Sequence, residues 1–283
     1  MIIFKRVTRL QEWLKTRKNE ALHIGFVPTM GALHEGHLSL IDRSREECDI
    51  TVVSIFVNPK QFNDPEDLRK YPRPIENDLK LLVEKNVDVL FLPDVEDIYP
   101  SDSLPLDFDP GILGSVMEGK FRPGHFAGVG EVMFRLLTII APDLLYMGQK
   151  DFQQVAIVRK LIADEHLNTT MIMCPTLREP GGLAMSSRNL RLSLQGRKDA
   201  AIIYKTLSEA QTAFEENVPV KQIIKQAIDK LTRNDFKPEY FSIVDGINLA
   251  DIESKEDSQF VVACCAVNVE GVRLIDNMIW TEN

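Results

Sequence analysis

The feature that most constrains this chain is the alternation of short apolar segments with amphipathic ones through its first two-thirds. The expected strands are Ile24–Val27, Ile50–Val57, Val87–Leu92, Leu144–Met147 and Thr170–Cys174, and the expected helices are Leu38–Glu47, Glu76–Asn86, Val129–Ile140 and Gln153–His166. Strands that are apolar throughout are typical of a parallel sheet covered on both faces. The pattern therefore predicts an α/β fold with a Rossmann-like, doubly wound parallel sheet.

The last third of the chain has a different order of elements. Ser193 is expected to cap a helix that runs to about Glu216, and a second helix covers Lys221–Arg233. Three strands then follow, at Tyr240–Val244, Phe260–Val267 and Arg273–Ile279. Helices followed by successive strands predict a small α+β domain. We expect a Rossmann-like nucleotide-binding catalytic domain over residues 1–187 and a smaller domain over 188–283 that closes over the site.

Charge and composition exclude several classes of protein. The chain has 283 residues, with 33 Lys and Arg against 42 Asp and Glu, so its net charge is −9. This balance argues against a nucleic-acid partner. The longest apolar runs, Leu136–Pro142 and Val261–Val267, are too short to cross a membrane, and no signal-peptide pattern opens the chain. Four cysteines without metal or redox spacing favour a reduced, cytoplasmic location.

The segment after the first predicted strand carries two glycines and two histidines. Strand Ile24–Val27 runs through Gly31 to His34-Glu35-Gly36-His37, and a helix follows. A helix N-terminus offers unpaired N–H groups to an anion, and glycine permits close approach of the backbone. His34 and His37 lie three residues apart, so they face the same way on a helical turn. Imidazoles placed there can stabilise developing phosphate charge. A zinc half-site is the weaker alternative, because no third ligand is evident nearby.

Polar residues also follow other predicted strands. Asn58 and Gln61 come after Ile50–Val57, whereas Gly148, Lys150, Asp151 and Gln154 come after Leu144–Met147. Ser186, Ser187 and Arg188 lie beyond the last parallel strand. Ligands of open α/β sheets bind outside the carboxyl ends of the strands, so these groups are expected to meet there. Two simpler interpretations remain. Asp151 could equally well be an ordinary helix N-cap, and the Ser186-Ser187-Arg188 turn could be a solvated loop.

Together these segments resemble the pantoate–β-alanine ligase family, one of the His-x-Gly-His nucleotidyltransferases. The resemblance spans most of the chain. The segments that carry it are Pro28–His37, Phe56–Phe62, Glu118-Gly119, Arg122–Phe126, Lys150–Gln154, Met185–Asn189 and Arg273–Asn277. It implies an AMP-forming ligase of pantothenate and coenzyme A biosynthesis. Pantoate would attack the α-phosphate of ATP to give pantoyl adenylate and pyrophosphate, and β-alanine would then displace AMP, with Mg²⁺ assisting. The family also implies a homodimer.

The resemblance further implies roles for individual residues. The catalytic set would be His34, His37, Lys150, Ser186, Ser187 and Arg188, with His37 as the usual candidate acid. ATP would contact Met30, Gly31, Ala32, Leu33, His34, Glu35, Gly36, His37, Gly148, Gln149, Lys150, Asp151, Leu177, Met185, Ser186, Ser187 and Arg188. Gln61 and Gln154 would hold pantoate, and Gln61 would also meet β-alanine. Asn58, Tyr71, Glu118 and Arg122 would line or support the pocket.

Some positions depart from the family pattern. Gln149 stands where Glu or Lys is usual, and Gly181-Gly182 stands where Asp-Gly is usual, so a carboxylate is missing before the Ser-Ser-Arg turn. No protein ligand for Mg²⁺ is therefore predicted. The Pro- and Gly-rich stretch Tyr99–Gly128 is the candidate lid.

Two other functions remain as alternatives. A related adenylyl- or cytidylyltransferase would stop at the nucleotide adduct, and Gln61, Gln154 and Arg122–Phe126 argue against it. A non-catalytic nucleotide-binding module would bind ATP without turnover, and the intact histidine pair and Lys150 argue against that.

Overall fold

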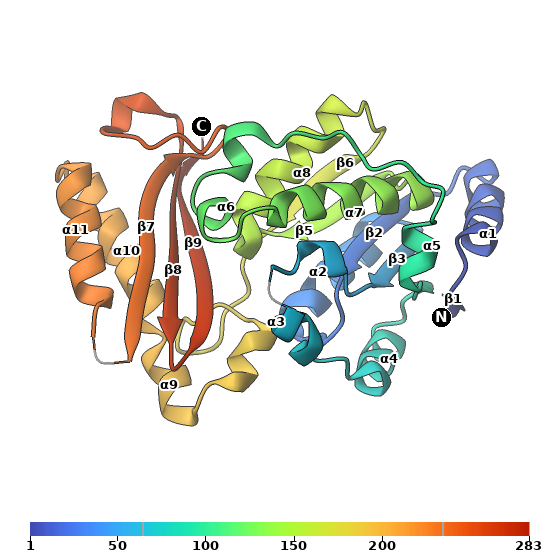
Figure 1. The fold of residues 1–283 in the computed structure, drawn as a ribbon, viewed down its shortest axis with the longest axis horizontal. Helices are drawn as coiled ribbons and strands as arrows, with labels where there is room; N and C mark the ends of the chain where they lie inside the picture. Colours follow the sequence, from blue (N-terminus) through green and yellow to red (C-terminus); the bar gives the residue numbers. More distant parts are fainter. Residues whose placement is uncertain (64, 234, 283) are drawn as a thin grey trace.

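A computed structural model describes residues 1–63, 65–233 and 235–282. A six-stranded sheet has the order β1-β4-β3-β2-β5-β6 with all pairs parallel, and a three-stranded antiparallel sheet has the order β7-β8-β9. Figure 1 shows the two sheets side by side. The strands are β1 Ile2–Phe4, β2 Ile24–Thr29, β3 Ile50–Ile55, β4 Val89–Phe91, β5 Leu144–Gly148, β6 Thr170–Cys174, β7 Phe236–Asp245, β8 Phe260–Val269 and β9 Val272–Glu282. The predicted parallel α/β sheet with a smaller C-terminal α+β part is confirmed.

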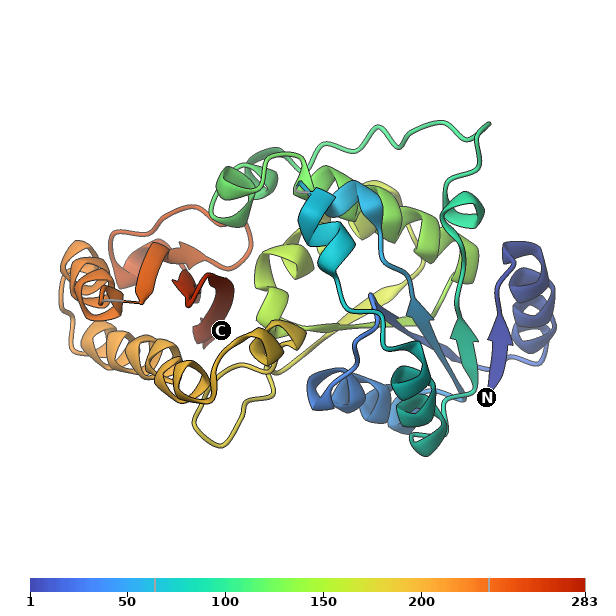
Figure 2. The same cartoon turned by 60° about the horizontal axis from the view of Figure 1, so that its bottom comes forward.

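Each central strand of the parallel sheet is buried on both faces. Phe26 and Val52 point into one apolar cluster, whereas their neighbours Val27 and Val53 point into another. Helices α2 (Glu35–Glu47) and α4 (Ile75–Glu84) cover the second face, and α7 (His125–Ile140) and α8 (Phe152–Asp164) cover the first (Figure 2). Continuous apolar strands arise because alternate side chains enter different layers.

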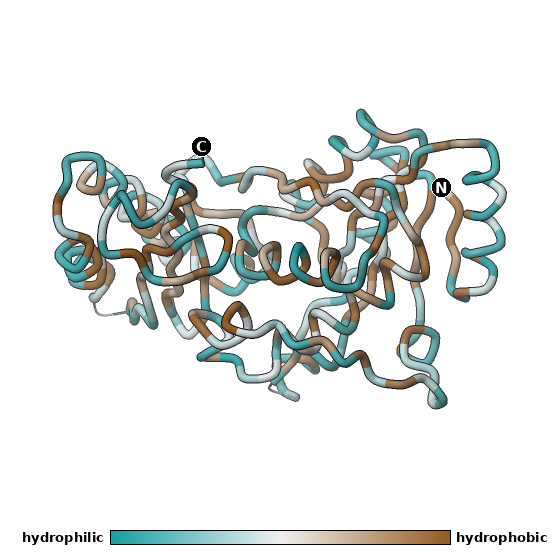
Figure 3. The backbone as a smooth tube through the Cα atoms, turned by 90° about the horizontal axis from the view of Figure 1, so that it is seen from above, coloured by the Kyte–Doolittle hydropathy of each residue, from teal (hydrophilic) through white to brown (hydrophobic). Residues whose placement is uncertain are grey.

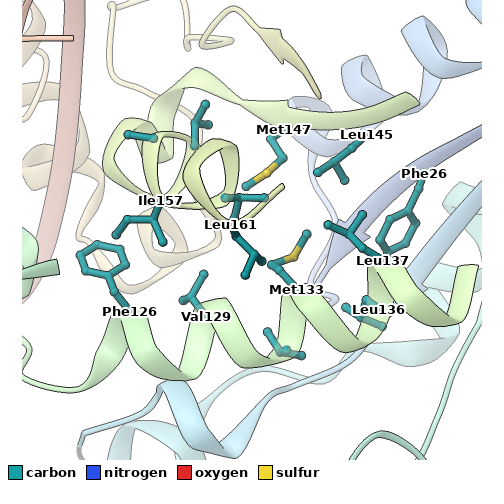
Figure 4. Close-up of a cluster of buried hydrophobic side chains, with 14 of the residues drawn as sticks. Phe26, Phe126, Val129, Met133, Leu136, Leu137, Leu145, Met147, Ile157 and Leu161 are labelled. Atoms are coloured by element: carbon teal, nitrogen blue, oxygen red, sulfur yellow. The ribbon is translucent and has the colours of Figure 1, made fainter. Parts of the chain in front are cut away.

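Helix α7 supplies much of the core on its side of the sheet. Val129, Met133 and Leu137 lie among side chains of β2, β5 and α8 (Figure 4). The helix begins at His125, one turn before the predicted start at Val129. Its first turns carry Gly128, where an added Cβ would lie 2.3 Å from the carbonyl oxygen of Lys60. Glycine therefore lets α7 approach the turn after β3 closely.

The C-terminal sheet packs on two sides. Helices α10 (Ile202–Glu215) and α11 (Val220–Leu231) share one apolar cluster with it, while Val262 and Phe260 join the core of α7 and α8. Ser193 caps α9 (Leu194–Asp199) as predicted, by accepting from the N–H of Gly196. The prediction of one continuous helix from Ser193 to Glu216 is wrong. The backbone N–H groups of Ala201 and Ile203 donate to carbonyl groups three residues earlier instead of four, and a second helix, α10, starts at Ile202. The division at 187/188 stays a prediction.

The stretch predicted to be a lid contains short helices and several anchors. Tyr99–Gly128 begins directly after α5 (Val95–Ile98) and contains a 3₁₀ turn at Gly111–Gly114, the short helix α6 (Glu118–Phe121) and the first turn of α7. The buried Gln153 amide donates to the carbonyl oxygens of Leu113 at 2.7 Å and Val116 at 2.9 Å. Its oxygen accepts from the N–H of Glu118 at 3.0 Å. Movement of the whole stretch as one lid would break these bonds, so the geometry argues against a lid that extends beyond Leu113.

The N-terminal segment was not predicted. β1 forms the edge of the parallel sheet, and α1 (Val7–Asn19) buries only Leu10 and Leu14 among its residues. Figure 3 shows that this helix is largely hydrophilic on its outer turns. α3 (Pro65–Lys70) was also missed. Within the described ranges, every helix is too short or too polar to cross a bilayer.

Candidate active site

The candidate site is a cavity of about 560 Å³ between the carboxyl ends of the parallel strands and the C-terminal part. Strand order reverses between β2 and β5, and open α/β sheets bind ligands at that point. Most predicted site residues line this cavity, namely Met30, His34, Gly36, His37, Asn58, Gln61, Tyr71, Glu118, Arg122, Gly148, Lys150, Asp151, Gln154, Leu177, Met185, Ser186, Ser187 and Arg188. Segments that are far apart in the chain thus meet as expected.

The turn after β2 is held in a left-handed conformation. Gly31 has φ +78° and Ala32 has φ +51°, the second being a strained value for a residue with a Cβ. The carboxylate of Asp78, which is 1 % exposed, accepts from the N–H of Ala32 at 2.9 Å and of Leu33 at 2.8 Å. This buried carboxylate from α4 stabilises the turn that leads into the histidines.

The histidines adopt defined tautomers at the start of α2. His34 is the N-cap residue, and its Nδ1 accepts from the N–H of Gly36 at 3.1 Å. The Nδ1 of His37 accepts from the N–H of His34 at 3.4 Å. The two ring centroids lie 4.1 Å apart. Because each Nδ1 is an acceptor, each neutral ring carries its proton on Nε2, free to donate to a ligand.

Both imidazoles are neutral at pH 7. Burial, with the nearby positive charge of Lys150, lowers the pKa of His34 to about 4. Burial and the neighbouring His34 lower the pKa of His37 to about 3. In the free protein the pair therefore acts as hydrogen-bond donors, and an acid role for His37 requires bound phosphate to raise its pKa.

Lys150 and Arg188 bring positive charge to the same region. Lys150 Nζ lies 3.2 Å from the Asp151 carboxylate, which makes no capping bond to α8, so the plain cap reading of Asp151 is wrong. Burial raises the pKa of Asp151, but the charge and hydrogen bond of Lys150 outweigh it and leave the pKa lowered. The Arg188 guanidinium lies 3.7 Å from Asp67 on α3, and both residues line the cavity.

A chain of hydrogen bonds fixes the Gln61 side chain. The Tyr99 hydroxyl donates to Asn58 Oδ1 at 2.8 Å, and Asn58 Nδ2 donates to Gln61 Oε1 at 3.1 Å. Gln61 Nε2 then points to the sulfur of Met30, 3.0 Å away, on the cavity wall. Asn58 is 1 % exposed, so its main effect on the site is to orient Gln61. Gln61 therefore presents an N–H donor, suited to a carboxylate or hydroxyl oxygen.

Arg122 and Glu118 form the part of the cavity wall next to Gln61. Arg122 Nη1 lies 3.1 Å from His125 Nε2, and His125 Nδ1 lies 2.8 Å from the carbonyl oxygen of Gln61. Glu118 forms a bidentate pair with Arg273 of β9 at 2.5 and 2.7 Å. Burial raises the pKa of Glu118, but its bonds to Arg273 outweigh burial and keep it lowered. Glu118 stays ionised and joins this wall to the C-terminal sheet.

Five predicted ATP contacts do not line the cavity. Gly31, Ala32 and Leu33 are buried within the turn after β2, Glu35 is exposed, and the Gln149 amide donates to Asn277. Sequence reasoning missed an apolar wall on α7, formed by Val129, Val132, Met133 and Leu136. The helical spacing of these residues is the signal that could have found the wall, although the same spacing also describes ordinary core. Asp78 and Asn277 were named only within longer segments.

The Gly181-Gly182 departure leaves the local turn intact. Arg178 and Ala184 pair across a small antiparallel bridge, and the N–H of Gly182 donates to the carbonyl oxygen of Glu179 at 2.7 Å. A Cβ added at Gly181 would make ordinary contact with Ala201 at 3.6 Å. The missing carboxylate is thus not needed to form the turn before Ser186.

Comparisons with known proteins agree on one family. The model of a family described as pantoate-beta-alanine ligase matches residues 2–279. The chain belongs to the pantoate–β-alanine ligase family. A pantothenate synthetase from Azobacteroides pseudotrichonymphae is 47 % identical over 283 residues, covering 99 % of this chain and 100 % of the relative. One from Cytophaga hutchinsonii is 45 % identical over 282 residues, covering 99 % of each. The predicted family and the predicted enzyme class, a ligase, are confirmed.

Solved structures of this family share the fold. Pantothenate synthetase from Thermus thermophilus superposes with a TM-score of 0.90 at 36 % identity, covering 100 % of both chains. The pantoate-beta-alanine ligase from Francisella tularensis, complexed with beta-gamma ATP and beta-alanine, gives 0.81 at 36 % identity. It covers 99 % of this chain and 98 % of that one.

Among the described residues no group of three or more His, Cys, Asp or Glu side chains is arranged to hold a metal ion.

Proposed function

We propose that this ligase joins pantoate to β-alanine in two steps at the single cavity described above. Pantoate carboxylate attacks the α-phosphate of ATP, which forms a P–O bond and releases pyrophosphate. The amine of β-alanine then attacks the acyl carbon of pantoyl adenylate, which forms the amide and releases AMP. The observation that carries the proposal is that donors for phosphate and donors for a small acid line the same cavity.

The phosphate donors are His34, His37, Lys150, Ser186 and Arg188. Negative charge becomes concentrated on the α-phosphate as it is attacked, and preorganised donors stabilise that charge without reorganising. The two Nε2–H groups act as neutral donors, because both histidine pKa values lie well below 7. Lys150 and Arg188 supply the positive charge. No side chain needs to act as a nucleophile, since both nucleophiles are substrates, and positioning supplies much of the rate.

The acid-binding end is formed by amides and apolar side chains. Gln61, in the turn after β3, and Gln154, on α8, line the same cavity as the apolar residues of α7. Amide N–H groups suit the hydroxyl and carboxylate oxygens of pantoate, and the apolar wall suits its methyl groups. β-Alanine would follow into the space near Gln61. Leu177, three residues beyond the end of β6, lines the same cavity and would contact the adenine through its backbone.

Mg²⁺ is proposed to arrive with ATP. The donor set fits: Mg²⁺ keeps several waters and binds substrate phosphates with one or two carboxylates, and the cavity wall offers Asp151 beside the phosphate donors. When bound, the ion neutralises phosphate charge. A homodimer and a cytoplasmic location are proposed from the family resemblance alone.

Pantoate-dependent exchange of labelled pyrophosphate into ATP, measured without β-alanine, tests the first step. The proposal predicts exchange that needs pantoate and is lost in Lys150→Gln. Exchange in the absence of pantoate, or AMP formation without any exchange, would overturn the adenylate route. A nucleotidyltransferase that lacks the second step would show exchange but no AMP when β-alanine is added.

A further inference from the structure

One segment that carries the family resemblance, Arg273–Asn277, has no role in the mechanism above. It lies in the first half of β9, an edge strand of the C-terminal sheet. Its last residue, Asn277, is 2 % exposed and reaches out of this sheet to the turn after β5. That turn carries Gln149 and Lys150, and Lys150 is one of the two positive charges proposed to meet the phosphates, with Arg188.

All the hydrogen-bonding groups of the Asn277 side chain bond to this one turn. Its Nδ2 donates to the carbonyl oxygen of Gln149 at 2.9 Å and to that of Lys150 at 2.9 Å. Its Oδ1 accepts from Gln149 Nε2 at 3.1 Å. Both donors and the acceptor are thus satisfied, and the amide has one orientation that meets all three partners. Gln149 was predicted to contact ATP, but its side-chain amide donates to Asn277 and so adds a third bond between the turn and β9.

The backbone of Asn277 is fixed as well. Its N–H donates to Asp276 Oδ1 at 2.8 Å, and its carbonyl oxygen accepts from Arg178 Nη2 at 3.2 Å. Arg178 also forms a bidentate pair with the buried Asp276 at 2.6 and 3.0 Å. The backbone of Asn277 is therefore fixed by residues of the C-terminal part, while its side chain bonds to the turn after β5. A donor held in this way fixes its acceptors more firmly than one on a free side chain.

We propose that Asn277 is a positioning residue for Lys150. The C-terminal sheet, through this one amide, sets the place of the turn from which Lys150 reaches the ATP phosphates. Gln149 shares the task, which accounts for an amide at this position. The inference rests on the phosphate role proposed for Lys150. It concerns the nucleotide end of the cavity and not the acid-binding end at Gln61.

Binding of a non-hydrolysable ATP analogue and of pantoate, measured separately by calorimetry, tests the proposal. We expect Asn277→Ala to weaken binding of the analogue about tenfold, since two carbonyl groups lose their donor. Pantoate binding should change less than about twofold, because Gln61 is held by Asn58 and Tyr99. Gln154 lies on α8, whose first turn is held separately by the bonds of Gln153 to Leu113 and Val116. A merely structural role would weaken both ligands together. Asn268→Ala, on the neighbouring strand β8, is the matched control and should change neither.

A double-mutant cycle with Lys150→Gln shows whether the effect passes through Lys150. In that background Asn277→Ala should weaken the analogue by less than about twofold further. If Asn277→Ala still weakened binding of the analogue about tenfold in the Lys150→Gln background, or weakened analogue and pantoate equally, the role of Asn277 would be overturned. The proposed role of Lys150 would then still stand. An unchanged affinity in Lys150→Gln by itself would overturn the proposed role of Lys150, and the inference with it. If Asn277→Ala does not fold, Gln149→Ala removes the contact from the turn and should weaken the analogue selectively; no selective loss would contradict the proposal.

Discussion

Asp78 on α4 holds the backbone of Leu33 through a hydrogen bond of 2.8 Å from the Leu33 N–H to its carboxylate. The second carboxylate oxygen takes the N–H of Ala32, whose φ of +51° is unusual for a residue with a side chain. Two residues that contribute no atoms to the cavity wall are thus kept in place by a third that lies outside it. The turn that presents His34 depends on this buried carboxylate.

Asp78→Asn should weaken ATP use while leaving the acid-binding end unchanged. The amide keeps the shape of the side chain but places an NH₂ group against one of the two backbone donors. We expect a loss of about 1–3 kcal/mol in unfolding free energy, as for a buried donor without a partner. The KM for ATP should rise about tenfold, because the turn that presents His34 loses one of the hydrogen bonds that hold it. Steady-state kinetics with each substrate varied in turn measures this.

The control for that variant is Asp42→Asn, which removes a partly exposed carboxylate paired with Lys85 at 2.5 Å. Partly exposed pairs contribute about 0–1 kcal/mol, so stability and kinetics should stay near those of the parent protein. An unchanged KM for ATP in Asp78→Asn would show that the turn keeps its conformation without the carboxylate.

Lys150→Gln should reduce kcat/KM for ATP by about 10²–10³-fold, because a charged donor aimed at the attacked phosphate is lost. Lys160→Gln, on α8 but paired with Asp164 at the surface, is the matched control. A similar loss in both variants would point to helix stability and not to charge at the phosphate. The comparison needs only an assay of AMP release.

Tyr99→Phe tests the chain of hydrogen bonds that ends at Gln61. Removing the hydroxyl leaves Asn58 Oδ1 with one donor, the N–H of Lys60 at 3.2 Å, so the Asn58 amide is less firmly oriented. The KM for pantoate should rise about three- to tenfold, the effect of one modest hydrogen bond. The KM for ATP should not change. Tyr204→Phe, in the C-terminal helices, serves as control, and a rise in the KM for ATP alone would contradict the assignment.

Three histidines should make the protein less stable in acid. Burial lowers the pKa of His34 and of His125 to about 4 and that of His37 to about 3, against an ordinary value of 6.5. Between pH 6.5 and pH 4 the unfolded chain therefore binds more protons than the folded one, and stability falls as pH falls. Each histidine contributes at most about 1.4 kcal/mol per pH unit, the limit reached in the middle of that window.

Urea unfolding at about pH 7 and about pH 5 measures this dependence. His125→Gln should reduce the difference between the two pH values by about a third, because one of the three linked groups is removed. Equal stability at both pH values would mean that these imidazoles gain protons in the folded state as easily as in the unfolded chain.

The parallel sheet and its loops could be predicted because their signals are local. Val52 and Val53 are both apolar since each enters a different layer, and the polar groups after β2, β3 and β5 follow directly from the strand ends. The N-terminal segment lacks such a signal, because β1 has 3 residues at an edge and α1 buries only Leu10 and Leu14. Periodicity therefore did not distinguish it from a loop.

The supporting residues of the site could not be predicted because their partners are distant in the chain. Asp78 holds the N–H of a residue 46 positions away, and Asn277 holds a carbonyl 128 positions away. Nothing near Asp78 in sequence distinguishes it from a solvent-facing carboxylate on a helix. Family resemblance suggested which residues face the substrates, whereas the side chains that hold them in place became apparent only from the three-dimensional arrangement.

The most direct test of the ligase account is AMP release from ATP and Mg²⁺, measured with pantoate and β-alanine each omitted in turn. A pantoate–β-alanine ligase should form AMP when both are present and none when either is missing. AMP formation without β-alanine, release of ADP in place of AMP, or no turnover by a folded protein that binds ATP would contradict it.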